Sequence, residues 1–250
     1  MINFVGAGPG AADLITVRGK ELLEQADIII YAGSLVNPDL LKYAKDSCEI
    51  YNSASMTLEE VTDTMIQGEK DQKNVVRLHT GDPAIYGAIR EQMDILDEHG
   101  IEYKVCPGVS SLFGTAAALK AEYTLPDVSQ SVIVTRMAGR TPVPERESIE
   151  SFAAHHATMV VFLSTGMLGE LSKRLIDGGY EPETPAAIVY KATWQDEKVV
   201  RTTVKDLEKS AKENNITKTA LITVGDFLGS KYDRSKLYDP SFSHEFRDAK

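Results

Sequence analysis

The chain has 250 residues and a mass of 27.4 kDa, enough for one large domain or two compact α/β domains. Its net charge of −10 disfavours nucleic acid, whose phosphates need a basic surface, and no apolar run approaches the roughly 20 residues of a membrane span. Two cysteines without CxxC spacing are too few for a disulfide framework or a zinc site, so we expect a cytoplasmic protein without its own metal.

The first half alternates short apolar runs with helical patterns. Strands are predicted at residues 2–5, 28–30, 75–79 and 102–106. Helices are predicted at about 16–25, from Pro38, from Leu58, at about 85–96 and up to Leu119. Thr57 and Glu60 have the spacing of a capping box at one helix start. This βαβα alternation predicts a mostly parallel sheet with helices on both faces.

A second α/β domain is predicted after a polar, proline-broken stretch near residues 120–131. Strands are predicted at residues 131–135, 159–163, 186–190, 199–203 and 220–224, with helices at about 148–154, 167–175 and 203–213. The close spacing of the later strands predicts a mixed sheet. We therefore expect an N-terminal domain at 1–121, a C-terminal domain at 122–229 and a polar tail at 230–250.

Three small-residue loops each follow a predicted strand of the first half: GAGPG at residues 6–10, TGDP at 80–83 and PGVSS at 107–111. Loops after parallel strands open on one edge of a sheet, where ligands collect in α/β folds. Small residues let a ligand approach the backbone closely. The three loops together predict a site for a small molecule, such as an adenosine with a compact tail.

An ordinary dinucleotide site fits the first loop less well, although Gly6 and Gly8 begin a Rossmann-like pattern that Ala11 completes. Pro9 lacks the backbone N–H that a pyrophosphate would need. Tyr31 stands near the end of the second strand, where a nicotinamide site needs an acidic residue, and Asp27 comes too early. A plain tight turn remains the simplest alternative for GAGPG alone.

Taken together, five motifs in order resemble the tetrapyrrole methylase family: GAGPG, TGDPAIYG at 80–87, CPGVSS at 106–111, AAIVYKAT at 186–193 and TALITVG at 219–225. The resemblance spans residues 2 to about 229. It implies two α/β domains with a cleft between them, S-adenosyl-L-methionine as methyl donor and S-adenosyl-L-homocysteine as product. The stretches at 31–38 and 129–145 are similar to the branch that methylates C11 of precorrin-4 or its cobalt form in cobalamin synthesis.

The resemblance also implies which residues hold the donor. They are Pro9, Thr80, Gly81, Asp82, Ile85, Tyr86, Ser110, Ser111, Ala192, Thr219 and Ala220. Ala192 stands where relatives often have glycine. Asp82 has a second interpretation, as the cap of a helix beginning at Pro83, and the two roles are compatible.

Methyl transfer from a sulfonium needs alignment rather than an enzyme nucleophile, so no catalytic triad is expected. His79, beside the TGDP loop, is the best-placed general base, although a buried structural histidine is the simpler interpretation. The substrate's acetate and propionate groups call for arginines. The candidates are Arg136 and Arg140 first, then Arg18 and Arg90. The aromatic residues Tyr31, Tyr123 and Trp194 are candidates for flanking the macrocycle.

The predicted partners are an anionic tetrapyrrole and, by resemblance, a second copy of the chain in a homodimer, without nucleic acid or membrane. Several alternatives stay open. Within the family the substrate could be uroporphyrinogen III, precorrin-2 or another ring position, although the continuation GAIREQ at 87–92 departs from the uroporphyrinogen branch. Diphthine-type and ribosomal RNA methylases are further alternatives. Outside the class stand a nicotinamide- or flavin-dependent oxidoreductase and a non-catalytic binder.

Overall fold

The computed structural model describes residues 1–236 and 239–249. By its internal contacts the chain divides into two compact units. The first unit is Met1–Thr115 with Lys191–Glu197, and the second is Ala116–Tyr190 with Lys198–Lys250. The division lies between Thr115 and Ala116, slightly before the predicted boundary at 121/122. The segment Lys191–Glu197 belongs to the first unit although it lies far along the chain.

The first unit is built on a five-stranded sheet in the order β3-β2-β4-β1-β5, and every neighbouring pair is parallel. The strands are β1 (Ile2–Gly6), β2 (Ile28–Tyr31), β3 (Glu49–Asn52), β4 (Val75–His79) and β5 (Tyr103–Cys106). The predicted parallel sheet is confirmed. Strands β4, β1 and β5, which precede the TGDP, GAGPG and PGVSS loops, are adjacent.

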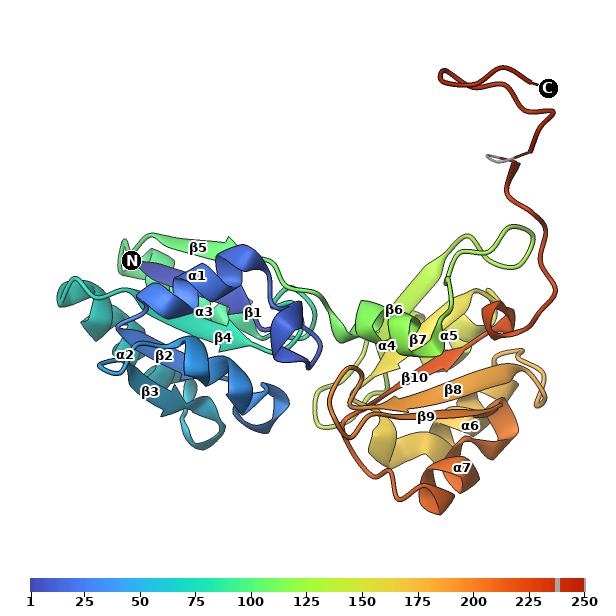
Figure 1. Ribbon diagram of the computed structural model, residues 1–250. Helices are drawn as coiled ribbons and strands as arrows, with labels where there is room; N and C mark the ends of the chain where they lie inside the picture. The colour runs from blue at the N-terminus through green and yellow to red at the C-terminus, as the bar shows by residue number, and fades with distance from the viewer. Residues whose placement is uncertain (237–238, 250) are drawn as a thin grey trace. The chain divides into compact units, whose positions relative to one another are not determined.

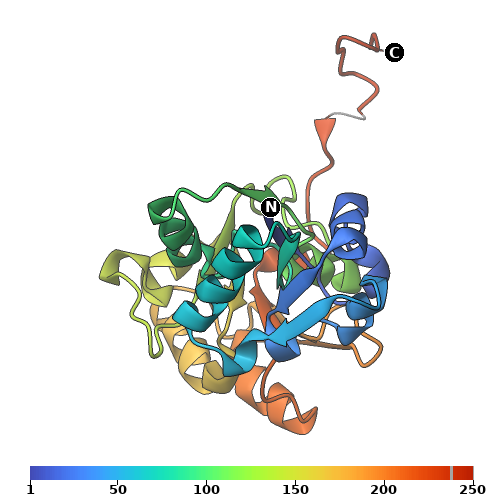
Figure 2. The ribbon, with the colours of Figure 1, turned by 90° about the vertical axis from the view of Figure 1, so that its left-hand side faces the viewer.

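Helices cover both faces of this sheet (Figure 1). They are α1 (Val17–Gln25), α2 (Leu58–Lys70) and α3 (Ile89–Glu98), with 3-10 turns at Ala12–Leu14, Gly33–Leu35, Pro38–Tyr43 and Ser53–Ser55. The next helix, α4 (Ser111–Leu119), contains the division between the two units. One core packs Leu23 of α1 against Val76 and Leu78 of β4, and the other packs Val61 and Met65 of α2 on the opposite face. Figure 2 views the molecule from the side of this unit, whose strands and helices run from blue to green.

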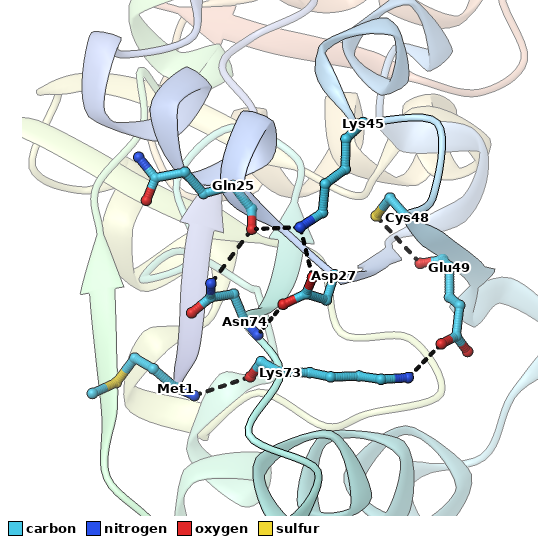
Figure 3. Close-up of polar contacts among 8 residues, drawn as sticks. All are labelled: Met1, Gln25, Asp27, Lys45, Cys48, Glu49, Lys73 and Asn74. Carbon is cyan, nitrogen blue, oxygen red and sulfur yellow. Dashed lines mark hydrogen bonds and ion pairs between the residues drawn. The ribbon is translucent and has the colours of Figure 1, made fainter.

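A polar network ties the strands together at their amino ends, away from the glycine loops (Figure 3). Asp27, just before β2, accepts hydrogen bonds from Lys45 Nζ at 2.6 Å and from the Asn74 backbone N–H at 2.8 Å. Lys73 pairs with Glu49 of β3. These contacts lower the pKa of Asp27, chiefly through the Lys45 hydrogen bond. Asp27 is therefore a structural residue, which agrees with its position too early for a ribose contact.

The second unit carries a mixed sheet in the order β6-β7-β10-β8-β9, as predicted. Only β6 and β7 are parallel; β10 runs antiparallel to β7 and β8, and β8 runs antiparallel to β9. The strands are β6 (Val132–Arg136), β7 (Thr158–Phe162), β8 (Pro185–Tyr190), β9 (Lys198–Thr203) and β10 (Ala220–Val224). The helices are α5 (Ile149–Ala153), α6 (Leu168–Asp177) and α7 (Leu207–Glu213). Their apolar faces form one core with the sheet.

Two local predictions were incomplete or wrong. The edge strand β3 was not predicted, because its sequence EIYN has one aliphatic residue and three of its four residues are exposed. The helix expected from about residue 85 begins only at Ile89. Tyr86 and Ala88 have φ of 56° and 49°, and this left-handed backbone cannot continue a right-handed helix. The apolar spacing of Ile85 with Ile89 therefore extended the helix one turn too far.

Other helix starts follow the predicted chemistry. Thr57 Oγ1 accepts from the Glu60 N–H, and Glu60 accepts from the Thr57 N–H at 2.8 Å, so the capping box of α2 is confirmed. None of the helices in the described ranges has the length and apolar character that crossing a membrane requires. In the predicted tail, Asp233 donates its N–H to the Pro126 carbonyl, and His244 and Arg247 pair through two backbone hydrogen bonds. Residues 237–238 and 250 of this tail lie outside the described residues.

Candidate functional site

The three glycine loops meet at the carboxyl edge of the first sheet. The Ala7 N–H donates to the His79 carbonyl at 2.7 Å, which continues the pairing of β1 with β4 beyond the strand ends. Gly8 and Gly81 then exchange two backbone hydrogen bonds, of 3.2 and 2.9 Å. Both glycines have positive φ, 82° and 59°, which side chains rarely adopt. The GAGPG and TGDP loops are thus joined directly through their backbones.

The PGVSS loop packs against the other two so closely that only glycines fit. A β-carbon added to Gly6 would lie 2.5 Å from the Gly108 Cα and 2.7 Å from the Gly81 carbonyl oxygen. A β-carbon added to Gly108 would collide with that same oxygen. The glycines are therefore required by contact between the loops themselves. The predicted convergence of the three loops is confirmed.

Asp82 links two of these loops through both carboxylate oxygens. Oδ1 accepts from the Ala84 N–H at 2.8 Å, which closes a turn within the TGDP loop, and Oδ2 accepts from the Gly108 N–H at 2.9 Å. The expected cap of a helix starting at Pro83 was wrong in detail, because the capped element is a turn and α3 begins later. The second link, to the PGVSS loop, was not anticipated.

Other predicted donor contacts occupy the same loops. Ser110 is buried, and its Oγ accepts from the Leu112 N–H at 3.2 Å at the start of α4. Thr80, Ile85 and Ser111 are half-buried, whereas Tyr86 is 44% exposed. Gly81 lies beside the PGVSS loop, since a β-carbon there would be 3.4 Å from the Ser111 nitrogen. These loops present backbone groups and small polar side chains.

Pro9 and the turn after it differ from a dinucleotide-binding loop. The glycine turn runs into a short 3-10 helix, Ala12–Leu14, and α1 begins only at Val17. Within the described ranges, the first α-helix after GAGPG thus begins too far along the chain for its amino terminus to bind a pyrophosphate at this turn. Pro9 instead packs against α4, where a β-carbon at Gly114 would be 2.7 Å from the Pro9 Cβ. These features disfavour the nicotinamide alternative.

His79 is 4% exposed and its ring stacks on Phe4 with 6.2 Å between centroids. Burial, with a smaller contribution from the charge of Arg77, lowers the pKa of His79 to about 3. The imidazole is therefore neutral at physiological pH. Its Nε2 has no hydrogen-bond partner within the described part of the chain. This environment is that of the buried structural histidine.

The hairpin tip between β8 and β9, Lys191–Glu197, belongs to the first unit and contacts the GAGPG turn. Thr193 Oγ1 accepts from the Ala11 N–H at 2.9 Å, and Thr193 donates its own N–H to Glu197 at 2.6 Å. Trp194 and the Ala192 carbonyl lie against Gly10, where a β-carbon would collide with the indole. The roles of Thr193 and Glu197 were missed, because neither residue type signals that Thr193 contacts a loop about 180 positions earlier or that Glu197 holds Thr193. Trp194, a candidate for flanking the macrocycle, packs its indole against Gly10 of the GAGPG turn.

The remaining donor candidates, Thr219 and Ala220, lie in the second unit at the start of β10. Thr219 has φ of 56°, and Ala220 is buried. Thr165 fixes the start of β10, since its hydroxyl donates a hydrogen bond to the Ala220 carbonyl at 3.1 Å. Tyr123 packs edge-to-face on Phe227 at 5.1 Å, and burial raises its pKa, as expected of a core residue.

The four candidate arginines differ in their exposure and in their hydrogen-bond and ion-pair partners. Arg136 is half-buried and donates to three carbonyls of its own loop, those of Met137, Thr141 and Pro142, at 2.9–3.2 Å. Arg140, in the same loop, is exposed. Arg90 pairs with Asp94 at 2.7 Å one turn along α3.

Arg18 is exposed near the start of α1. Arg136 ends β6 and Arg140 lies in the loop that follows it in the second unit, whereas Arg18 and Arg90 lie on separate helices of the first.

The chain is similar, over nearly its whole length, to known methyltransferases. A cobalt-precorrin-4 C(11)-methyltransferase of Methanocaldococcus jannaschii is 57% identical over 98% of this chain and 95% of its own. A precorrin-4 C(11)-methyltransferase of a Sinorhizobium species is 42% identical over 98% of both chains. The solved structure of the cobalamin biosynthetic enzyme cobalt precorrin-4 methyltransferase, CbiF, has 49% identity and a TM-score of 0.89, over 92% of this chain and 96% of that one.

A sequence model of the family "Tetrapyrrole (Corrin/Porphyrin) Methylases" matches residues 1–208, which include GAGPG, TGDP, PGVSS and the hairpin tip. The resemblance carried by the five motifs is thereby confirmed. The chain belongs to the tetrapyrrole methylase family.

Proposed function

We propose that the protein is an S-adenosyl-L-methionine-dependent C-methyltransferase that methylates C11 of precorrin-4, in its cobalt form, during cobalamin biosynthesis. The observation that carries the proposal is the convergence of three glycine loops at one sheet edge, in a chain 57% identical to an enzyme named for this reaction. The cobalt form is favoured because relatives at 57% and 49% identity are named for cobalt-precorrin-4, whereas one at 42% is named for precorrin-4.

The residues of the first unit fit the donor. The loops present backbone groups and small polar side chains, and they lack the acidic residue after β2 that a nicotinamide ribose would require. We assign donor contacts in this unit to Pro9, Thr80, Gly81, Asp82, Ile85, Tyr86, Ser110, Ser111 and Ala192; Thr219 and Ala220, of the second unit, stay candidates by family resemblance. Within this set Asp82 acts chiefly by holding the TGDP and PGVSS loops together, because both of its oxygens accept backbone N–H groups.

S-adenosyl-L-methionine would supply a methyl group already activated by a positively charged sulfur, so that a nucleophilic carbon can displace it directly. The contribution of the chain is then to align the reactants and exclude water. Rigid loops suit this role, since the backbone bonds at Gly8 and Gly81 and the Asp82 bridge fix them relative to one another. Buried and neutral, His79 is assigned a structural role.

The tetrapyrrole substrate carries several carboxylates, which arginine binds through paired hydrogen bonds. We assign the principal contact to Arg140, whose exposed side chain lies on the loop that Arg136 braces through three carbonyls. Arg18 and Arg90 are secondary candidates, and Arg90 would have to leave its ion pair with Asp94. We further propose a homodimer in the cytoplasm, which sedimentation of the purified protein would test.

A thermal-unfolding comparison tests the donor assignment. Saturating S-adenosyl-L-homocysteine should raise the unfolding temperature, because a ligand at 100 times its Kd adds about 2.7 kcal/mol of stability. NADH at the same concentration should leave it unchanged. Stabilisation by NADH but not by S-adenosyl-L-homocysteine would contradict the proposal. Transfer of label from the donor into precorrin-4 then separates an enzyme from a binder without activity.

A further inference from the structure

A buried arginine lies in the strand that leads into the TGDP loop. Arg77, in the middle of β4, is 6% exposed. Its Nε donates to Gln92 Oε1 at 3.1 Å, and its Nη1 donates to the Ile30 carbonyl at 3.1 Å. Among residues 1–236 and 239–249, no carboxylate forms an ion pair with Arg77. Burial lowers the pKa of Arg77 to about 10, so the guanidinium remains charged at neutral pH.

This charge fixes the orientation of the Gln92 amide. A guanidinium can only donate hydrogen bonds, so the amide oxygen of Gln92 must face Arg77. The amide nitrogen then points the other way and donates to the Ala88 carbonyl at 3.0 Å. Gln92 is itself 4% exposed, so water cannot readily replace either bond. The result is one continuous chain of hydrogen bonds from Arg77 through Gln92 to Ala88.

The chain of hydrogen bonds ends at Ala88, in the segment that joins the TGDP loop to α3. Ala88 and Tyr86 both have left-handed backbone conformations, which are costly for residues other than glycine. They persist only where surrounding contacts hold them. This segment carries Ile85 and Tyr86 between the TGDP loop and α3. The Gln92 bond is placed to hold the segment at its junction with the helix.

We propose that Arg77 and Gln92 are positioning residues: through the Ala88 carbonyl they hold the segment 85–88 in the conformation that binds the methyl donor. Neither residue needs to touch the donor. The inference rests on the proposed function in one respect, namely that this segment contacts S-adenosyl-L-methionine. The hydrogen-bond chain itself does not depend on that assignment.

Gln92→Glu separates positioning from stability. The new carboxylate keeps an acceptor for Arg77 and gains an ion pair, but it cannot donate to the Ala88 carbonyl. We expect the unfolding temperature to be maintained or raised, and the Kd for S-adenosyl-L-homocysteine to rise about tenfold, from loss of one hydrogen bond and repulsion between two oxygens. The KM for the donor should rise similarly, with kcat at saturating donor changed less than twofold.

Gln67→Glu is the matched control, because Gln67 is exposed on α2 and its side-chain amide bonds to Asp71 alone within residues 1–236 and 239–249. Its Kd should equal that of the wild type. A double variant tests whether Arg77 acts through Gln92. Arg77→Met combined with Gln92→Met should raise the Kd for S-adenosyl-L-homocysteine no more than Gln92→Met alone. Additive losses in the double variant would contradict that dependence.

Hydrogen exchange gives a readout without donor. In Gln92→Glu, amides of residues 85–89 should exchange several-fold faster than in the wild type, and those of β4 should not change. Unchanged exchange, or an unchanged Kd in a folded Gln92→Glu protein, would overturn the positioning role. Failure of the wild type to bind S-adenosyl-L-homocysteine would instead overturn the proposed function, and faster exchange would still establish that Gln92 holds the segment.

Discussion

The bridge made by Asp82 gives the sharpest test of how the loops are held. Its carboxylate accepts two backbone N–H groups, from Ala84 at 2.8 Å and from Gly108 at 2.9 Å. Hydrogen bonds to a charged group contribute about 1.5–3 kcal/mol each, and the half-buried position favours the lower end. Asp82→Ala should therefore cost about 3 kcal/mol. Asp82→Asn should cost about half as much, because its amide has one oxygen and turns an N–H₂ toward the other donor.

Hydrogen exchange resolves these two bonds individually. In Asp82→Ala, the amides of Ala84 and Gly108 should both exchange at least tenfold faster, since about 1.4 kcal/mol corresponds to a factor of ten. In Asp82→Asn, only one of the two should do so. Asp97→Asn is the control, because Asp97 is exposed and, among the described residues, its carboxylate accepts a hydrogen bond only from the Tyr103 hydroxyl. Full protection of Gly108 in a folded Asp82→Ala protein would refute the bridge.

Three further predictions concern the loops, His79 and the arginines. Gly108→Ala should abolish donor binding or folding, because its β-carbon collides with backbone, whereas Gly139→Ala, with nothing within 4 Å, should be neutral in the same binding and thermal assays. The pKa of His79, about 3 when folded, lies below its unfolded value near 6.5, so the unfolded state binds the proton first and stability falls as pH drops below 6.5. At pH 5 this loss is about 2 kcal/mol, and denaturant curves of His79→Gln should lack it; identical pH slopes would contradict the assignment. Arg140→Ala should raise the KM for the tetrapyrrole at least fivefold without changing donor Kd, while Arg136→Ala should in addition increase exchange of its loop; an unchanged KM in both would mean that the carboxylate site lies elsewhere.

Much of the scaffold was predictable, because hydrophobic periodicity and helix caps are local signals. The parallel sheet, the mixed second sheet and the Thr57 capping box follow from such patterns. The convergence of the three glycine loops was also predictable, since parallel strands deliver their following loops to one edge. The family, likewise, was identifiable from five motifs in order.

What the sequence did not reveal depends on contacts between distant segments. Thr193 reaches the first loop from a hairpin tip far along the chain, where Glu197 accepts its backbone N–H, and nothing in either residue type indicates these contacts. The early helix prediction at Ile85 failed because apolar spacing carries no information on the left-handed backbone at Ala88. Arg136 was a first candidate for binding the substrate carboxylates, but its guanidinium donates to the carbonyls of Met137, Thr141 and Pro142, contacts that residue type alone does not indicate.

The most direct test of the central claim is the position of the transferred methyl group. Purified protein is incubated with ¹³C-methyl-labelled S-adenosyl-L-methionine and either cobalt-precorrin-4 or metal-free precorrin-4, and the product is analysed by mass spectrometry and NMR. The account predicts one labelled methyl on C11, formed faster from the cobalt-containing substrate. A methyl on any other ring carbon, or no label in either macrocycle, would contradict it.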